Sequence, residues 1–483
     1  MAQNVAMLRR GSTIRRVGAA RKAPLALQYE PMMRRPGWAR EFFRRAALEL
    51  AIWIIWLALV SIDWLLTWLQ LPLLVFERLA PRMWGERKRV VIAGASFGGL
   101  AVQRELAGRR DLDVTVVDVK EYFEYTPGIL RCFVRPNYLS ALTCPLPRRR
   151  NELIVGEVVG VSKAAVTVVE RSSAGPRTVE VPFDYLVLAC GSTYQAPVKP
   201  TWAEPSLGER TASWQEAHRK LKQAEDVLIV GAGAVGVELA AEVLHQFPRK
   251  RVSIVDQATA ILPGFPEQSA RFARDWLEAH GAVFRLGEKI AEIGQQSVTL
   301  ATGEVLFAGV VYKCVGVKPN TSALRDSPLL SPHLVGAREA VRVNDQLQLE
   351  GEGLDHIYCV GDMMSHASRE LKLGHTAELN AKLVALNIGR VQQRQPPLAY
   401  PEGAVGAQTS PHIFCLSLGP YDATLGFNRL LIHGWLPALA KWVLEWTKVA
   451  AAAERPIGIL FWTIADYASC LLARTLLREP EQA

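Results

Sequence analysis

The sequence is poor in cysteine, and no pattern in it brings two cysteines together. Seven cysteines are spread over 483 residues, at positions 132, 144, 190, 314, 359, 415 and 470. They form no Cys-x-x-Cys pair, and no Cys/His spacing resembles a zinc site. The sequence therefore predicts reduced, mostly buried thiols, disfavours a dithiol relay for electrons, and predicts no bound metal.

Outside its N-terminal arm the chain lacks any excess of charge. Residues 1–45 contain eleven Lys and Arg residues against two acids, and the whole chain carries a net charge of +9. The other 438 residues therefore hold 45 basic and 45 acidic side chains. A nucleic-acid-binding protein needs a basic folded domain, so we predict no nucleic-acid partner.

The basic arm, residues 1–45, has two interpretations. Its Arg-rich, acid-poor composition is typical of a mitochondrial or plastid transit segment. The alternative is an arm that lies on anionic lipid. The first interpretation places the protein in an organellar membrane, with the mitochondrial inner membrane preferred to a plastid membrane.

Two apolar runs lie near the ends of the chain. Residues 51–76, within a segment 46–84, carry one charge, Asp63, and are long enough to cross a hydrocarbon core of roughly 30 Å. Asp63 near the middle of such a helix would cost about 2.5–3.5 kcal/mol. We predict a membrane helix at 46–84, with a helix buried against a partner or the C-terminus as the alternative. The region 401–483 is predicted to dock on membrane lipid, with its run 457–477 in the interface in preference to spanning.

Between these runs the chain alternates strands and helices, and a first glycine-rich turn joins a strand to a helix. Gly94, Ser96, Gly98 and Gly99 lie in this turn, where a helix N-terminus attracts a pyrophosphate. Ser96 replaces the middle glycine and adds a Cβ where the backbone approaches phosphate, although its hydroxyl can donate a hydrogen bond. Asp118, 24 residues after Gly94, is expected to accept hydrogen bonds from ribose hydroxyls. The alternative is an ordinary acid at a strand end.

A second, complete glycine fingerprint follows the strand near residue 230. It consists of Gly231, Gly233 and Gly236, with Asp256 at the end of the next strand. A carboxylate at this place repels a 2′-phosphate, so NADH is preferred, while the basic residues 249–251 leave NADPH possible. Two such units in one chain predict an α/β fold with two Rossmann-type domains.

The order of these motifs resembles the superfamily of FAD- and NAD(P)H-dependent pyridine nucleotide oxidoreductases. Within it, residues 88–430 look like type II NADH:quinone dehydrogenases and the ferroptosis suppressor protein/apoptosis-inducing-factor-like branch. The resemblance implies that the first fingerprint binds FAD and that the second, inserted domain binds NADH or NADPH. It predicts an FAD domain at 87–222 and 341–400 and an NAD(P)H domain at 223–340.

The resemblance also implies further cofactor-binding residues. Lys120 begins a segment that runs from the adenosine side toward the flavin, and Arg131 either counters a pyrophosphate charge or is a surface arginine. Turns at Gly191 and Gly316 follow strands that border the two domains. In the late motif Gly361-Asp362, the carboxylate of Asp362 is implied to lie on the ribityl or phosphate region of the flavin.

Three residues are candidates for chemistry beside the two cofactors. By resemblance Glu238 lies near the nicotinamide and the flavin, where it holds the carboxamide or helps proton movement; the alternative is a helix-surface glutamate. Lys372 and His375 stand where type II dehydrogenases carry a glutamine-rich helix. The histidine can deliver a proton to a quinone oxygen, and the lysine can stabilise quinol oxyanion charge. The alternatives are a packing histidine and a solvated lysine.

Together these features predict a membrane-attached, FAD-dependent NAD(P)H:quinone oxidoreductase. Because no cysteine pair can accept electrons, they must leave directly from the flavin, and a lipid quinone is the acceptor that the apolar segments favour. One alternative is a structural or assembly subunit of a larger organellar membrane complex that retains a flavoprotein fold. A second is a reductase of a soluble quinone or another acceptor.

Overall fold

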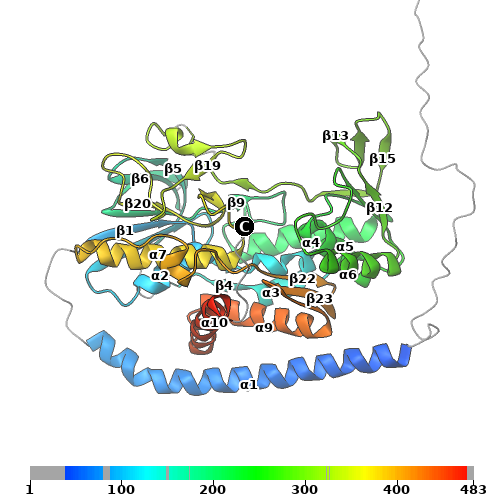
Figure 1. Cartoon of the computed structure of the whole chain (residues 1–483), viewed down its shortest axis with the longest axis horizontal. Helices are drawn as coiled ribbons and strands as arrows, with labels where there is room; N and C mark the ends of the chain where they lie inside the picture. Colours follow the sequence, from blue (N-terminus) through cyan, green and yellow to red (C-terminus); the bar gives the residue numbers. More distant parts are fainter. Residues whose placement is uncertain are drawn as a thin grey trace, which may run out of the picture.

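The computed structural model describes residues 38–79, 87–147, 152–172, 175–321, 324–325 and 327–475, and Figure 1 shows their arrangement. Most of the predicted basic arm, residues 1–37, lies outside the described residues, as do residues 80–84 of the predicted hydrophobic segment. Two sheet-based units stand side by side, and three long helices lie beneath them.

The first unit is built on a seven-stranded sheet with strand order β20-β8-β1-β2-β5-β6-β7. Its central strand β1 (Lys88–Ala93) pairs in parallel with both neighbours, and its last four residues are buried. Strands buried on both faces are near-continuous apolar runs, as in KRVVIA. The other strands are β2 (Leu112–Asp118), β5 (Glu152–Val161), β6 (Ala165–Ser172), β7 (Gly175–Pro182), β8 (Tyr185–Leu188) and β20 (Ile357–Cys359).

The second unit is inserted into the first, between β8 and β20 along the chain. Its four parallel strands follow the order β12-β11-β10-β16, and a three-stranded antiparallel sheet adjoins it. These strands are β10 (Asp226–Val230), β11 (Arg251–Asp256), β12 (Val283–Leu286) and β16 (Val310–Lys313), followed by β13 (Ile290–Ile293), β14 (Ser297–Leu300) and β15 (Val305–Phe307). The predicted α/β fold, with one Rossmann-type unit inserted in another, is confirmed.

Helices flank both sheets. In the first unit α2 (Phe97–Leu106) packs against α7 (Gly374–Gln392), and in the second α5 (Ala234–Gln246) packs on β10 and β11. The remaining helices of the two units are α3 (Leu139–Leu142), α4 (Leu207–Gln223), α6 (Glu267–Ala279) and α8 (Glu402–Val405), with 3-10 turns η2 (Thr126–Phe133), η3 (Pro136–Tyr138), η5 (Ser331–His333) and η6 (Gly361–Met363). Short strand pairs complete the units: β3 (Tyr122–Glu124) with β4 (Thr143–Pro145), β9 (Ser192–Thr193) with β17 (Lys318–Pro319), and β18 (Leu334–Val335), β19 (Ala340–Arg342) and β21 (Met364–Ser365).

The C-terminal region forms a base under the two units. An antiparallel meander, β22 (Ile413–Leu418), β23 (Asp422–Phe427) and β24 (Leu430–Gly434), leads into α9 (Trp435–Ala452) and α10 (Pro456–Arg474). The N-terminal helix α1 (Trp38–Leu79) runs along this base beneath α9 and α10 (Figure 1). Apolar helices are therefore present at both places where the sequence predicts them.

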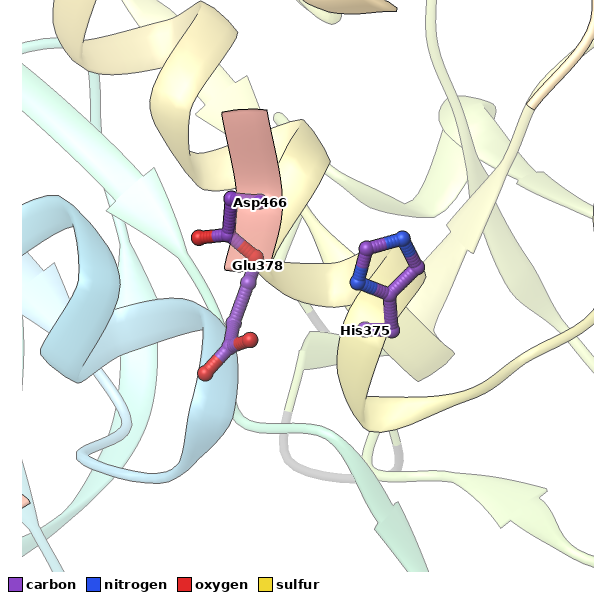
Figure 2. Close-up of side chains that lie close together, drawn as sticks. All are labelled: His375, Glu378 and Asp466. Atoms are coloured by element: carbon purple, nitrogen blue, oxygen red, sulfur yellow. The ribbon is translucent and has the colours of Figure 1, made fainter. Parts of the chain in front are cut away.

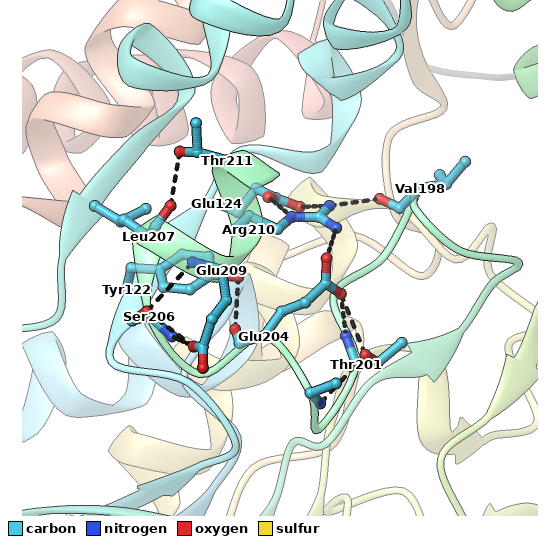
Figure 3. A network of polar contacts seen from close by, with 11 residues as sticks. Tyr122, Glu124, Val198, Thr201, Glu204, Ser206, Leu207, Glu209, Arg210 and Thr211 are labelled. Carbon is cyan, nitrogen blue, oxygen red and sulfur yellow. Dashed lines mark hydrogen bonds and ion pairs between the residues drawn. The ribbon is translucent and has the colours of Figure 1, made fainter. Parts of the chain in front are cut away.

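A buried polar network holds the segment after β2 against α4. Arg210 on α4 is completely buried and donates to both carboxylate oxygens of Glu124, at 2.7 and 2.9 Å, and to Glu204 at 3.1 Å (Figure 3). Its guanidinium also lies 4.9 Å from the ring centre of Trp214. Glu124 ends β3, so this network fixes the path of residues 120–125.

We predict that Arg210→Met lowers the free energy of unfolding by about 3–5 kcal/mol, because it leaves Glu124 and Glu204 as uncompensated buried carboxylates. Arg219→Met is the matched control, since Arg219 lies on the same helix, is mostly exposed and pairs with Glu216. The control should cost at most about 1 kcal/mol. Denaturant midpoints followed by tryptophan fluorescence measure the difference, and equal midpoints would contradict the prediction.

Candidate functional site

The first glycine-rich turn has the backbone that a nucleotide phosphate requires. Gly94 has a positive φ of 109°, and a side chain on Gly99 would collide with the Gly94 carbonyl, so helix α2 can pack closely on β1 only with glycine there. Ser96 stands at the N-cap of α2, but its side chain makes no capping hydrogen bond. The N–H groups of the first turn of α2 therefore keep the capacity to bind an anion.

Asp118 is more than the end of a strand. Its Oδ2 accepts the backbone N–H of Ala95 at 2.6 Å, and its Oδ1 accepts the backbone N–H and the ammonium of Lys120 at 3.1 and 3.0 Å. Both Asp118 and Lys120 are buried. The carboxylate thus ties β2 to the glycine turn, and since each oxygen can accept two hydrogen bonds, capacity for ribose hydroxyls remains.

The second glycine turn repeats this arrangement. Gly231 has φ of 115°, and a side chain on Gly236 would collide with the Gly231 carbonyl, whereas nothing lies within 4 Å of the place of a Cβ on Gly233. Asp256 accepts the backbone N–H of Ala232 at 2.6 Å and that of Ala258 at 2.7 Å. Both units therefore use the acid of the second strand to hold the glycine turn. The sequence patterns do not reveal this second task of the two acids.

Two glycine turns mark the connection between the units. Gly191 and Gly316 both have φ of 69°, and nothing lies within 4 Å of the place of a Cβ on either. Asn320 joins the two turns, because its backbone N–H donates to the Gly191 carbonyl at 3.0 Å and its side chain to the Cys190 carbonyl at 2.8 Å. Neither glycine is therefore required by close packing, and both are explained by their positive φ.

The late motif is also held by residues that the sequence did not single out. The N–H of Gly361, which has φ of 73°, donates to Asn380 Oδ1 at 3.1 Å. Asp362 accepts from the Ser192 hydroxyl and pairs with Lys199 at 3.2 Å. The carboxylate of Asp362 therefore lies at the connection between β8 and β9, within the first unit.

Helix α9 meets the two units with a charged face. Lys441, Glu445 and Lys448 are spaced i, i+4 and i+7, which places them on one side of the helix, and all three are buried. Lys441 pairs with Glu238 of the second unit, Glu445 accepts from the Tyr138 hydroxyl, and Lys448 pairs with Glu378 of α7. One helix thus contacts both dinucleotide units through charges.

Glu238 is held on one side only. Its Oε1 accepts the backbone N–H of Ser417 at 2.7 Å, the Ser417 hydroxyl at 2.8 Å and the ammonium of Lys441. Among the residues that the structure describes, none donates a hydrogen bond to Oε2. The carboxylate is therefore fixed in orientation by the C-terminal meander and by α9, with Oε2 left for another contact.

Arg131 occupies a place that neither sequence interpretation foresaw. Its Nε donates to Glu242 on α5 at 3.1 Å, and its guanidinium lies 4.9 Å from the ring centre of Tyr138. The partner of Arg131 is thus a carboxylate of the second unit. This contact links η2 to α5 across the boundary between the units.

The start of α7 gathers His375, Glu378 and Asp466, whose candidate ligand atoms all lie within 4.8 Å of one another (Figure 2). Each acid already has an ammonium partner, Lys448 for Glu378 and Lys382 for Asp466. We therefore interpret the group as an ion-pair network and do not assign a metal to it.

His375 and Lys372 differ in how they are bound. Burial lowers the pKa of His375, so its imidazole is neutral at pH 7, and its Nε2 is buried without a hydrogen-bond partner. Lys372, three residues earlier, is one-third exposed and lies 3.8 Å from Glu370.

The family of the chain follows from a comparison with family models. The model for pyridine nucleotide-disulphide oxidoreductases matches residues 88–381, more than half of the chain. The chain belongs to this family. The match begins at β1 and ends in α7, so it includes both glycine turns and the late motif.

Individual proteins agree with this family. Ferroptosis suppressor protein 1 of Homo sapiens is 26% identical over 353 residues, which cover 69% of this chain and 87% of the relative. The structure of NDH2 from Plasmodium falciparum in complex with NADH superposes with a TM-score of 0.62 at 13% identity, covering 82% of this chain and 99% of the other. The sulfide:quinone oxidoreductase of Aquifex aeolicus gives 0.61 at 16% identity, covering 81% and 96%. The predicted resemblance to the superfamily and to the ferroptosis suppressor branch is confirmed.

Membership of the pyridine nucleotide-disulphide oxidoreductase family confirms an FAD-dependent NAD(P)H oxidoreductase and its two cofactors. The structure fits both: two helix N-termini, of α2 and α5, point out of glycine turns, and an acid stands beside each turn. The roles of individual residues remain predictions. Ser192, Lys199, Asn380 and Lys441 were not among the predicted site residues. Of these, Lys441 had a signal, the charged i, i+4, i+7 spacing on an otherwise apolar helix.

We predict that Asp256→Ala reduces the preference for NADH over NADPH, expressed as the ratio of kcat/KM values, by about tenfold. The variant removes the carboxylate that repels a 2′-phosphate and accepts ribose hydrogen bonds. Asp256→Asn separates charge from loop support, since it keeps an oxygen for a backbone N–H. Asp275→Ala, exposed on α6, is the control and should leave the ratio unchanged. A preference that survives in Asp256→Ala would show that this acid does not face the nucleotide.

Proposed function

We propose that the chain is a membrane-attached NAD(P)H:quinone oxidoreductase, which takes hydride from NADH and passes electrons to a lipid quinone. The observation that carries the proposal is the position of α9. Its buried face contacts both dinucleotide units, while α10 and α1 pack against it below. The junction of the two nucleotide sites therefore lies next to the apolar base of the molecule, where a lipid-soluble acceptor would arrive.

The state of the cysteines supports a direct transfer of electrons from the flavin to the acceptor, with no disulfide as an intermediate carrier. All seven cysteines are free in the structure. Burial raises the pKa of Cys144, Cys190 and Cys314 to about 12, so these thiols stay protonated and unreactive at pH 7. Although the family is named for disulphide substrates, this chain is not proposed to act on one.

For the nucleotides, we propose an FAD domain at 87–222 and 341–400 and an NAD(P)H domain at 223–340. The turn of Gly94, Ser96, Gly98 and Gly99, with Asp118 and Lys120, would hold FAD together with Gly191, Gly361 and Asp362. The turn of Gly231, Gly233 and Gly236, with Asp256 and Gly316, would hold NADH. Bound FAD supplies the two-electron chemistry between nicotinamide and quinone.

For the chemistry, we propose roles for Glu238, His375 and Lys372. Glu238, anchored through Oε1, would orient the nicotinamide carboxamide with Oε2. The neutral imidazole of His375 would donate a hydrogen bond from its ring N–H to a quinone oxygen, and Lys372 would stabilise negative charge on the quinol. Arg131, through Glu242, would position α5 and with it the nucleotide turn.

The location is proposed to be an organellar membrane, with the mitochondrial inner membrane preferred to a plastid membrane. Two described helices are apolar and long enough to cross a bilayer, Phe43–Pro72 within α1 and Pro456–Arg474. The basic composition of residues 1–45 supports an organellar address.

A second candidate is a structural or assembly subunit of a larger membrane complex. It is favoured by α1, which precedes the segment that matches the family, and by Ser96, which puts a side chain at a phosphate turn. Two features argue against this candidate: the glycine turns that are each supported by an acid, and the anchored Glu238. Both suit the binding of cofactors, and a purely structural subunit would not need them.

We predict that the purified protein carries flavin whose absorbance near roughly 450 nm bleaches anaerobically on addition of NADH and returns with a short-chain ubiquinone. His375→Gln and Lys372→Met should leave the bleaching rate unchanged and slow the return by about 100-fold. Lys220→Met, exposed on α4, is the matched control for the lost lysine charge.

Stopped-flow absorbance separates the possible outcomes. Bound flavin that never bleaches would favour the structural subunit. Bleaching without reoxidation by quinone would point to another acceptor. Equal rates in His375→Gln, Lys372→Met and the parent would remove these two residues from the acceptor side.

A further inference from the structure

Four of the five charged side chains of α1 between residues 41 and 72 contact the body of the protein, and the other one, Glu41, pairs with Arg44 and Arg45 of α1 itself. Arg44 pairs with Asp422 at 2.8 Å, and Glu49 accepts from the Tyr421 hydroxyl at 2.9 Å. Arg45 pairs with Glu41 at 2.7 Å and lies over the Tyr421 ring. The last of these charges, Asp63, pairs with Arg455 at 2.7 Å. Between residues 50 and 72 Asp63 is the one charged residue, so the rest of this stretch presents no charge outward.

Asp63 also explains how α10 begins. It is only 6% exposed, and besides two contacts with the Arg455 guanidinium it accepts the backbone N–H of Ile457 at 3.1 Å. Ile457 is in the first turn of α10, so the carboxylate satisfies an N–H that the helix cannot satisfy itself. The one charge in the apolar run is thus a docking contact and need not enter lipid.

The outward side of α1 is a long apolar strip. Trp53, Ile54, Leu57, Trp64, Leu65 and Trp68 are each more than half exposed. The adjacent helix α10 also carries exposed apolar residues, namely Leu460, Ile464, Tyr467 and Leu471. Only 6% of the most apolar stretch of α1 is buried, compared with 39% of the most apolar stretch of α10.

The docking contacts decide how α1 can sit on a membrane. Its 42 residues make a rod of about 63 Å, twice the roughly 30 Å of a hydrocarbon core. It is pinned at Arg44 and again at Asp63, 19 residues further on, so it lies flat along the base (Figure 1). A helix pinned at two such distant points cannot turn perpendicular to the body without breaking one ion pair.

We propose that α1 lies in the plane of the membrane, with its outer strip and that of α10 immersed in one leaflet, and that it does not cross the bilayer. Lipid is the occupant because 46–72 presents no outward charge, whereas a protein interface has a polar, charged rim. Tryptophans along the strip suit the boundary between headgroups and acyl chains. The proposal rests on the membrane attachment proposed above but is independent of cofactor and acceptor.

Topology in sealed vesicles tests this placement. The full chain is synthesised in the presence of preformed vesicles of phosphatidylcholine and phosphatidylglycerol, as Arg40→Cys or Arg78→Cys, one at each end of α1. Lys220→Cys, exposed on α4, marks the side of the body, and the unsubstituted chain gives the background. A membrane-impermeant maleimide should label both end variants to the same extent as the Lys220→Cys marker.

Any one of three results would overturn the proposal. Labelling of one end and protection of the other until detergent is added would mean that α1 spans. Failure of the chain to float with the vesicles would mean that the strip binds something other than lipid. As a second measurement, Leu57→Lys, which places a charge on the strip, should reduce the floated fraction at least about tenfold, and flotation unchanged by it would also refute the proposal. None of these measurements needs NADH or a quinone. The proposed membrane placement can therefore be refuted while the proposed activity holds, and the activity can be refuted while the placement holds.

Discussion

The structure depends on the buried ion pairs of α9. Lys441, Glu445 and Lys448 each meet a partner from a different part of the chain: Glu238 of the second unit, Tyr138 after η2, and Glu378 of α7. Removing such charges from water costs several kcal/mol each, so the pairs are weak evidence for stability. Their effect is on geometry, because any shift of α9 would leave an unpaired buried charge. The two nucleotide units are thereby held in one relative placement.

The helices at the base of the molecule also pair their charged side chains with partners. Charges turn inward and apolar side chains turn outward, on α1 as on α10. In α9 the inward side is the charged one as well, whereas a helix of a water-soluble protein turns its apolar side inward. This reversed placement of charged and apolar sides is explained if the helices face lipid. Apolar side chains that face lipid are kept out of water just as they would be in a protein core.

Short sequence patterns correctly predicted the features whose residues lie close together in the sequence. The glycine turns and the acids Asp118 and Asp256 follow from short spacings, and the structure forms both turns as expected. The insertion of one unit into the other is implied by the family resemblance. In the sequence alone Asp63 is an energetic cost within an apolar run, because its partner Arg455 lies 392 residues away. Arg131 has its partner on α5, and Lys441 and Lys448 have theirs on α5 and α7. Contacts between distant buried charges leave no periodic signal, so the orientation of α9 and α1 came only from the structure.

Gly233 bears on whether the chain is an enzyme or a scaffold. It stands at the N-cap of α5 with φ of −76°, so no unusual backbone conformation demands glycine, and nothing lies within 4 Å of the place of its Cβ. Ser, Asp or Asn would cap the helix better. Gly231 and Gly236 have internal reasons to be glycine; Gly233 has none, and the close approach of a pyrophosphate supplies one. In the first turn Ser96 holds the corresponding place, so there a side chain stands where the second turn leaves the backbone bare.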